Sequence, residues 1–209
     1  MERLAIMGGS FDPIHMGHLR MAYAVQKQLV FDKVVFLPSY IPPHKQKRTD
    51  FASWEDRLAM VRLAVQAYED FTVSTLEFDR GGVSYTYDTV NFMQELWPDA
   101  EIYLIIGEDS LTQLYTWHKV LDLLRMVHFV AAERPGYEGE AGVARLAKAY
   151  GPWVEEKIIH AEVPETAISS TEIRKRLKDG LPVRGMTPPA VEQYLYEHRL
   201  YQTTERKEG

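Results

Sequence analysis

The chain has 209 residues, 45% of them hydrophobic, and a formal net charge of −6. This composition excludes intrinsic disorder, and the acidic balance argues against a general nucleic-acid-binding protein. Cysteine is absent, which excludes disulfides and thiolate zinc sites, and no apolar stretch approaches the 18 residues of a membrane span. We expect one cytoplasmic domain over residues 1–202 and a mobile polar tail over 203–209.

Strand-like and helical segments alternate along the chain. The predicted strands are residues 4–7, 33–38, 71–76, 101–106, 127–132 and 157–163. The predicted helices between them are residues 19–31, 53–68, 84–96, 110–125 (two short pieces) and 143–150. This alternation predicts an α/β fold with a doubly wound parallel sheet, in which ligands bind beyond the carboxyl ends of the strands.

Two more helices are predicted after the last strand. The segment ISSTEIRKRLKDG begins with Ser169 and Glu172 in the spacing of a capping box, and Gly180 fits its end. The segment TPPAVEQYLYEHRLY has Thr187 as a predicted cap and Pro188 at the first helical position. We expect both helices to pack on the sheet rather than to form a second domain.

The first strand leads into an unusual turn. Gly8 and Gly9 follow the strand, and His15 and His18 stand at the start of the next helix. Free amides and the positive end of the helix dipole favour an anion there, and glycines let the backbone approach a ligand closely. Neither the P-loop pattern nor G-x-G-x-x-G is present. The turn therefore predicts a phosphate site in which histidines replace the P-loop lysine.

Other interpretations of the two histidines stay open. Their spacing places the rings side by side on one helical turn, which could also hold a metal ion. Without neighbouring carboxylates that site would be poor. Two capping or surface histidines are the structural alternative.

Several motifs together carry a family resemblance. GGSFDPIHMGH at 8–18 resembles the first motif of the nucleotidyltransferases that contain HxGH, and ISSTEIR at 168–174 resembles their second motif. PPHK at 42–45, VSYTYDTV at 83–90 and GEDSLTQLYTWH at 107–118 make the chain similar to the bacterial nicotinate-nucleotide adenylyltransferases. The resemblance covers roughly residues 3–201.

The resemblance implies a Rossmann-like fold and one reaction of NAD synthesis. The 5′-phosphate of nicotinate mononucleotide attacks the α-phosphate of ATP, which gives deamido-NAD and pyrophosphate without a covalent enzyme intermediate. It implies Mg²⁺ bound through the ATP phosphates and no metal site on the protein. The implied partners are ATP and nicotinate mononucleotide, with no nucleic acid or membrane. The sequence allows a homodimer but does not give the oligomeric state.

The resemblance also implies which residues form the site. His15 and His18 would be catalytic, as donors to phosphate oxygens. The implied ATP-binding residues are Gly8, Gly9, Ser10, Phe11, His18, Gly107, Asp109, Ser169, Ser170, Thr171 and Arg174. The implied nicotinate mononucleotide-binding residues are Ser10, Ser39, Lys45, Ser84, Tyr85, Thr86, Trp117 and Arg134.

Three of these positions, and Asp12 beside them, have structural alternatives. Asp12 could act as a base, but the attacking phosphate is already ionised, and shaping the turn is an equally good role. Lys45 could be a solvated loop cation, Arg174 a surface arginine on a capped helix, and Trp117 a core residue. The helix start at Ser84–Thr86 favours an anion and so predicts a preference for the acid over the amide nucleotide, although the sequence does not give the degree of that selectivity.

Rival functions fit the sequence less well. Pantetheine-phosphate adenylyltransferases are shorter and lack the SYTYDT and TWH stretches, and a cytidylyltransferase is further away. A fragment resembling an aminoacyl-tRNA synthetase would share HMGH but need a KMSKS stretch. A non-catalytic nucleotide sensor would not need both motifs intact.

Overall fold

The computed structural model describes residues 2–42, 51–133 and 140–202. These residues form one six-stranded, all-parallel sheet in the order β3-β2-β1-β4-β5-β6. The strands are β1 (Arg3–Gly9), β2 (Lys33–Pro38), β3 (Phe71–Val73), β4 (Glu101–Gly107), β5 (His128–Glu133) and β6 (Ile158–Glu162). The predicted doubly wound parallel sheet is confirmed.

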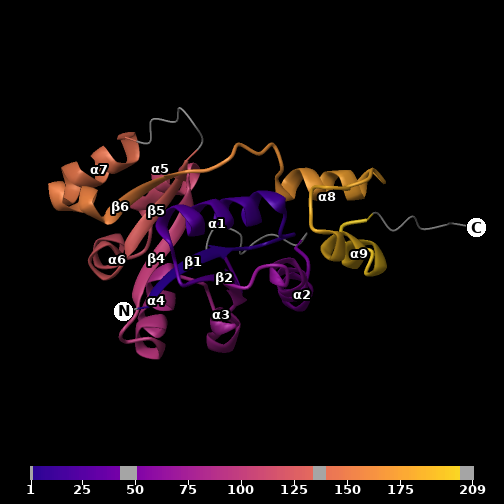
Figure 1. Cartoon of the computed structure of the whole chain (residues 1–209), viewed down its shortest axis with the longest axis horizontal. Helices are drawn as coiled ribbons and strands as arrows, with labels where there is room; N and C mark the ends of the chain where they lie inside the picture. The colour runs from indigo at the N-terminus through magenta and orange to yellow at the C-terminus, as the bar shows by residue number, and fades with distance from the viewer. Residues whose placement is uncertain (1, 43–50, 134–139, 203–209) are drawn as a thin grey trace, which may run out of the picture.

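Helices cover both faces of the sheet. One face packs against α1 (Met16–Leu29), α2 (Trp54–Val65), α8 (Ser170–Lys178) and α9 (Pro189–Glu197). The other packs against α4 (Thr86–Leu96), α5 (Glu108–Gln113), α6 (Val120–Met126) and α7 (Glu140–Tyr150). The shorter elements are α3 (Leu76–Arg80), η2 (Leu114–Thr116) and η3 (Pro152–Lys157). Figure 1 shows α8 and α9 at the end of the molecule opposite the N-terminus.

The central strands carry continuous apolar runs because both faces of the sheet are buried. Along β4, Tyr103 and Ile105 join the core beneath α1 and α2. Leu104 and Ile106 join the core beneath α4 and α6. Side chains that alternate between two cores explain why this strand shows a continuous apolar run instead of an alternating pattern.

The third strand is shorter than predicted. It ends at Val73 instead of residue 76, and Leu76 begins a helix that the sequence analysis missed. The hydroxyl oxygen of Ser74 accepts a hydrogen bond from the amide of Leu76, and the Thr75 hydroxyl donates to Asp79. Such local bonds from serine and threonine compete with strand pairing and favour a turn into a helix.

The two C-terminal helices pack on the sheet as expected, with one correction. Ser169 caps α8 by accepting from the amide of Glu172, and Gly180 follows the helix with a positive φ of 69°. The prediction for α9 was shifted by one residue. Its N-cap is Pro188, and the Thr187 hydroxyl is buried with no hydrogen-bond partner among the residues that the structure describes.

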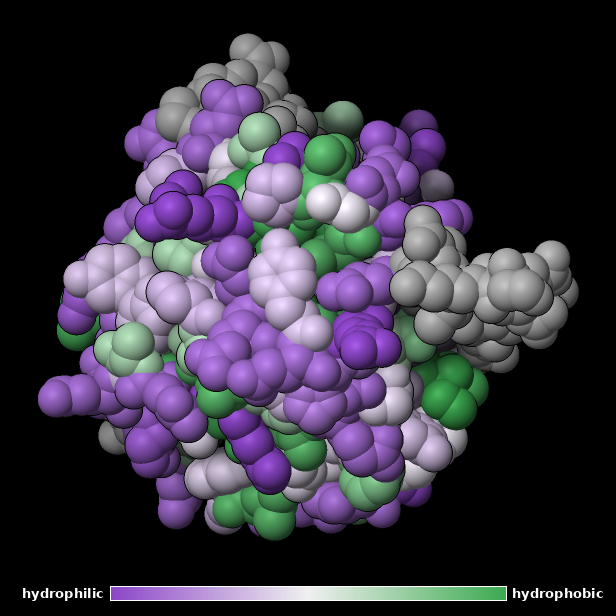
Figure 2. Space-filling view, turned by 90° about the vertical axis from the view of Figure 1, so that its right-hand side faces the viewer, coloured by the Kyte–Doolittle hydropathy of each residue, from purple (hydrophilic) through white to green (hydrophobic). Residues whose placement is uncertain are grey.

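The end of the molecule that carries α8 and α9 is mostly hydrophilic, with only scattered apolar side chains (Figure 2). Within the described ranges, no helix is long and apolar enough to cross a membrane.

Candidate active site

The turn after β1 lies at the switch point of the sheet. β1 pairs with β2 on one side and with β4 on the other, so the crossovers leave the sheet in opposite directions there. The carboxyl ends of these strands bring together the turn after Gly9, the loop that begins at Ser39, and Gly107. The switch point of such a sheet is the usual place for a ligand.

The two histidines stack at the start of α1. Their ring centroids are 3.7 Å apart, with an interplanar angle of 25°. His15 is the N-cap residue, and its Nδ1 accepts from the amide of Gly17 at 3.1 Å. The Nδ1 of His18 accepts from the amide of His15 at 3.2 Å. A nitrogen that accepts a hydrogen bond carries no proton, so in each ring the N–H lies on Nε2.

The two rings differ in exposure. His15 is 7% exposed, and burial lowers the pKa of its imidazole to about 4. His15 is therefore neutral near pH 7 and acts as a dipole rather than as the cation that the sequence allowed. His18 is half-buried, and Phe11 packs edge-on against it at 5.1 Å between ring centroids.

The first-turn amides of α1 are not free. The amide of Met16 donates to the carbonyl of Met186 at 2.9 Å, and those of His18 and Leu19 donate to the carbonyl of His15. The amide of Gly17 is taken by the ring of His15. The prediction of free amides at this helix start was wrong, and the Nε2–H groups of the two imidazoles are the donors that the pair adds to this turn.

The glycines of the first motif have different roles. A Cβ at Gly8 would meet no atom within 4 Å, so this position opens onto free space that a ligand could enter. A Cβ at Gly17 would lie 2.9 Å from the ring of His15, closer than real contacts allow. Gly17 is therefore needed for His15 to fold over the helix start. Gly9 is backed by the ring of Phe11, which adopts a φ of 45°.

Asp12 is buried in the turn, and its Oδ1 atom holds two other segments of the chain against it. Only 1% of it is exposed. Its Oδ1 accepts from the amide of Ala52 at 3.0 Å and from the hydroxyl of Tyr201 at 2.5 Å. Of the two roles left open for Asp12, this geometry favours the structural one.

Helix α8 is fastened to the same turn. Arg174 donates to the carbonyl of Asp12 at 2.6 Å, and its guanidinium lies 3.6 Å from the Asp12 carboxylate. The Ser170 hydroxyl donates to the carbonyl of Pro13 at 2.9 Å, and Thr171 lies 3.3 Å from Arg174. The structure thus brings the second motif against the first.

Arg57 of α2 is a site residue that the sequence analysis missed. It is 4% exposed and donates to the carbonyls of Ser10 and Ser39 at 2.8 Å and of Tyr40 at 3.2 Å. Burial lowers its pKa, while the charge of Asp12 opposes that shift. Its position between Trp54 and Val61 on the apolar stripe of the helix was the signal that could have revealed it.

The predicted pyridine side gathers around the start of α4. The Ser84 hydroxyl is buried and accepts from the amide of Tyr40 at 3.0 Å, which makes it a support for the loop after β2. Tyr85 is the N-cap, Thr86 is the first helical residue, and the ring of Tyr85 lies 4.8 Å from His118. The N-terminal end of α4 therefore lies beside the loop after β2.

Trp117 shows features of both roles considered for it, a core residue and a residue that binds nicotinate mononucleotide. It is partly buried against the core beneath α4 and α6, edge-on to Phe129 at 6.2 Å between ring centroids.

Asp109 is exposed in the first turn of α5, whose N-cap is Gly107. Lys45 and Arg134 lie outside the described residues.

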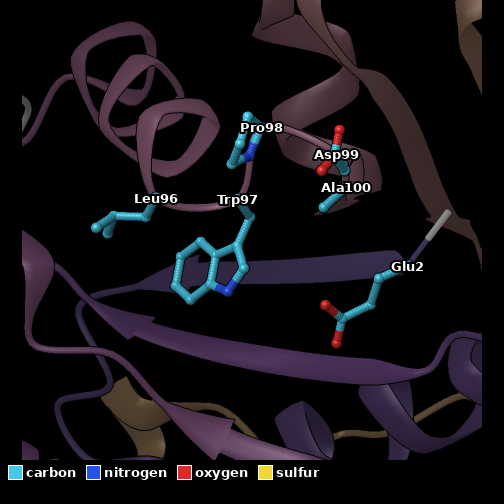
Figure 3. A pocket seen from close by; sticks show the side chains of 6 residues that line it. All are labelled: Glu2, Leu96, Trp97, Pro98, Asp99 and Ala100. Carbon is cyan, nitrogen blue, oxygen red and sulfur yellow. The ribbon is translucent and has the colours of Figure 1, made fainter.

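A hollow of about 240 Å³ lies elsewhere, between Glu2 and residues 96–100 (Figure 3). Glu2 and Ala100 immediately precede β1 and β4, so this hollow is at the amino ends of the strands. It has no part in the candidate site.

Similarity to known proteins agrees with the motifs. The chain is 41% identical over 200 residues to a protein of Desulfitobacterium hafniense named probable nicotinate-nucleotide adenylyltransferase, covering 96% of each chain. A protein of the same name from a Thermoanaerobacter species is 41% identical over 207 residues, covering 97% of this chain and 96% of that one.

The fold also matches solved structures. A Plasmodium falciparum nicotinic acid mononucleotide adenylyltransferase complexed with NaAD superposes with a TM-score of 0.75, at 20% identity, over 96% of this chain and 98% of that chain. Residues 6–176 match the cytidylyltransferase-like family. The chain belongs to this family and, within it, to the nicotinate-nucleotide adenylyltransferases.

Proposed function

We propose that the protein transfers the adenylyl group of ATP to nicotinate mononucleotide, giving deamido-NAD and pyrophosphate. An oxygen of the mononucleotide phosphate bonds to the α-phosphorus of ATP, and the bond from that phosphorus to the bridging oxygen of the β-phosphate breaks. The observation that carries the proposal is the stacked His15–His18 pair, which holds two Nε2–H donors at the switch point of the sheet.

The reaction needs alignment and charge stabilisation more than a base. The attacking phosphate is already ionised, and negative charge grows on the leaving pyrophosphate. We assign His15 and His18 to donate to phosphate oxygens in the transition state, where fixed donors need no reorganisation. The open space at Gly8 leaves room for the triphosphate beside them.

Helix α8 supplies the remaining ATP contacts in this proposal. Its first turn carries Ser169, Ser170 and Thr171, and Arg174 follows one turn later. A guanidinium at a helix start suits a phosphate group because charge and geometry both match. The bond from Ser170 to Pro13 keeps this helix start against the first motif.

We assign the acceptor nucleotide to the loop after β2 and the start of α4. A carboxylate on the pyridine ring suits the positive end of α4, at Tyr85 and Thr86, and the ring itself suits Trp117. A site built for a carboxylate penalises an amide, because groups are then left unpaired. The acid mononucleotide is therefore the preferred acceptor. Ser39 belongs to this acceptor side in the proposal, whereas Gly107 and Asp109 are assigned to ATP. The assignments of Lys45 and Arg134 to the acceptor nucleotide stay predictions.

The proposal includes Mg²⁺ as a companion of ATP. Across residues 2–42, 51–133 and 140–202, no three histidine, aspartate or glutamate residues gather as metal ligands. Asp12, the carboxylate of the first motif, already accepts from Ala52 and Tyr201. The donors at this rim suit phosphate oxygens, so the ion would be held by phosphates and water, where it neutralises charge. A cytoplasmic location and a homodimer remain predictions.

Pyrophosphate release with ATP and a panel of acceptors tests the proposed function. We expect nicotinate mononucleotide to have the highest kcat/KM, with nicotinamide mononucleotide and phosphopantetheine well below it. Equal kcat/KM values for the two pyridine nucleotides would contradict the proposed selectivity, and a preference for phosphopantetheine would contradict the function.

The His18→Ala variant tests the chemistry. Loss of one preorganised donor should lower kcat by about 10²–10³ while changing the KM for ATP much less. His198→Ala is the matched control, because His198 is exposed at the end of α9. A thermal melt of both variants checks that they fold. A His18→Ala enzyme with wild-type kcat would remove His18 from the mechanism.

A further inference from the structure

The segment that follows α9 contacts the first motif. Tyr201 lies after α9, 189 residues beyond Asp12, and its hydroxyl donates to the Asp12 carboxylate at 2.5 Å. Tyr201 holds a left-handed φ of 61°, which a tyrosine adopts at a cost. The packing around Tyr201 therefore compensates for the cost of this backbone conformation and keeps the hydroxyl in contact with Asp12.

Asp12 connects this tyrosine to the second motif. The same carboxylate accepts from the amide of Ala52, and its second oxygen faces Arg174 at 3.6 Å. Arg174 also donates to the backbone carbonyl of Asp12. The negative charge of Asp12 is thus shared among several donors, and Arg174 receives only part of its attraction.

Tyr201 stays a hydrogen-bond donor throughout the working pH range. Burial of the phenol and the nearby charge of Asp12 both raise its pKa well above the ordinary value. The guanidinium groups of Arg174 and Arg57 act in the opposite direction but do not reverse the shift. The hydroxyl therefore remains protonated and bonded to the carboxylate.

We propose that Tyr201 is a positioning residue for ATP, which holds the Asp12 carboxylate and thereby leaves Arg174 able to contact a phosphate group. Without the hydroxyl, Asp12 turns its charge toward Arg174 and competes with the nucleotide for the guanidinium. The inference rests on the proposed function, in which Arg174 contacts ATP. It assigns Tyr201 a role in binding that its distance along the chain from the first motif would not suggest.

The Tyr201→Phe variant removes one oxygen and leaves the ring. A matched control exists, because the Tyr194 hydroxyl donates to the carboxylate of Asp56 at 2.9 Å, at the contact between α9 and α2. Tyr194→Phe therefore deletes a bond of the same kind that does not involve Asp12. Binding of the Mg²⁺ complex of α,β-methylene-ATP is measured for both variants by calorimetry, together with their melting temperatures.

We expect Tyr201→Phe to raise the Kd for the ATP analogue about tenfold, since a hydrogen bond to a charged group is of that size. Tyr194→Phe should change this Kd less than about twofold while lowering the melting temperature similarly. The Kd for nicotinate mononucleotide should not change in either variant. An unchanged Kd for the ATP analogue in Tyr201→Phe, or an equal rise in both variants, would overturn the proposal.

A second comparison keeps the test valid if the variants lose stability. In an Arg174→Lys background, Tyr201→Phe should have little further effect on analogue binding, because the effect passes through the guanidinium. A full tenfold effect there would refute the route through Arg174. Binding of the analogue needs no acceptor, so a failure of the proposed acceptor specificity would leave this result readable.

Discussion

The histidine pair shows how backbone bonds determine what a side chain can do. Both Nδ1 atoms are occupied by backbone amides, so the rings present the same tautomer to the rim. His15 is also neutral, since burial lowers its pKa to about 4. The catalytic contribution that we propose for His15 is therefore that of a fixed dipole, whose strength does not depend on protonation near pH 7.

The buried state of His15 predicts how stability depends on pH. Between about pH 6.5 and 4 the unfolded chain binds a proton at this residue and the folded chain does not. The free energy of unfolding therefore falls as pH drops through this range, by up to about 3 kcal/mol. Above pH 6.5 the residue contributes no pH dependence.

Urea denaturation of the wild type and of His15→Asn from pH 4 to 7.5 measures this contribution. Asparagine is a good N-cap but does not titrate, and every other ionisable group is common to both proteins. The wild type should lose more stability than the variant on acidification. Parallel curves for the two proteins would mean that His15 is solvated or paired in solution.

At the scale of elements, the sequence predicts a strand or a helix correctly where residues close together in the chain determine it. The apolar run at 33–38 gave β2 with its observed bounds. The helix predicted to begin at residue 53 matches the start of α2, where Ser53 is the N-cap and accepts from the amide of Asp56. The bond that occupies the first amide of α1 comes from Met186, 170 residues further along the chain. Nothing in the sequence around His15 carries information about that partner, so free amides were the natural but wrong prediction.

Arg57 is the clearest case in which helix packing decides a role. Its three acceptors lie in the loops after β1 and β2, so one guanidinium from α2 sets the distance between those loops. Arg57→Lys keeps the charge but loses the planar fork that reaches several carbonyls. We expect a loss of about 2–4 kcal/mol in the free energy of unfolding and a kcat at least about tenfold lower.

The matched control is Arg62→Lys, which changes an exposed arginine of the same helix. Urea midpoints and kcat for both variants, measured side by side, check the prediction. If Arg57→Lys is as stable and active as Arg62→Lys, then a single ammonium is enough to hold the two loops.

At the scale of the whole molecule, the sequence predicts a parallel sheet but not its strand order. The order β3-β2-β1-β4-β5-β6 depends on the direction in which each crossover leaves its strand, and the helix sequences do not specify that direction. The gathering of Gly9, Ser39 and Gly107 at one edge was predictable because parallel strands share their carboxyl ends. The contact from Tyr201 to Asp12 was not, since it depends on where α9 finally packs.

The packing of α8 and α9 predicts that the described chain unfolds as one unit. Ile173, Leu177, Val191 and Leu195 are at most 3% exposed and lie in the same core cluster as α1, α2 and the central strands. Removing residues 165–209 would expose the facing apolar surface and free the amide of Met16. Because burial of this area is a large share of a marginal net stability, the remaining chain should not fold cooperatively.

Hydrogen exchange of the full-length protein tests this without truncation. Amides of α9 should exchange with the same free energy and the same denaturant dependence as those of β1 and β4, because each opens only by global unfolding. The shortened chain, residues 1–164, should show no sigmoidal thermal transition. A lower free energy of exchange in α9, or a cooperative transition in the shortened chain, would mean that the C-terminal helices dock onto a sheet that is stable by itself. In that case Tyr201 could reach Asp12 only when they are docked, and ATP affinity would follow the docking equilibrium.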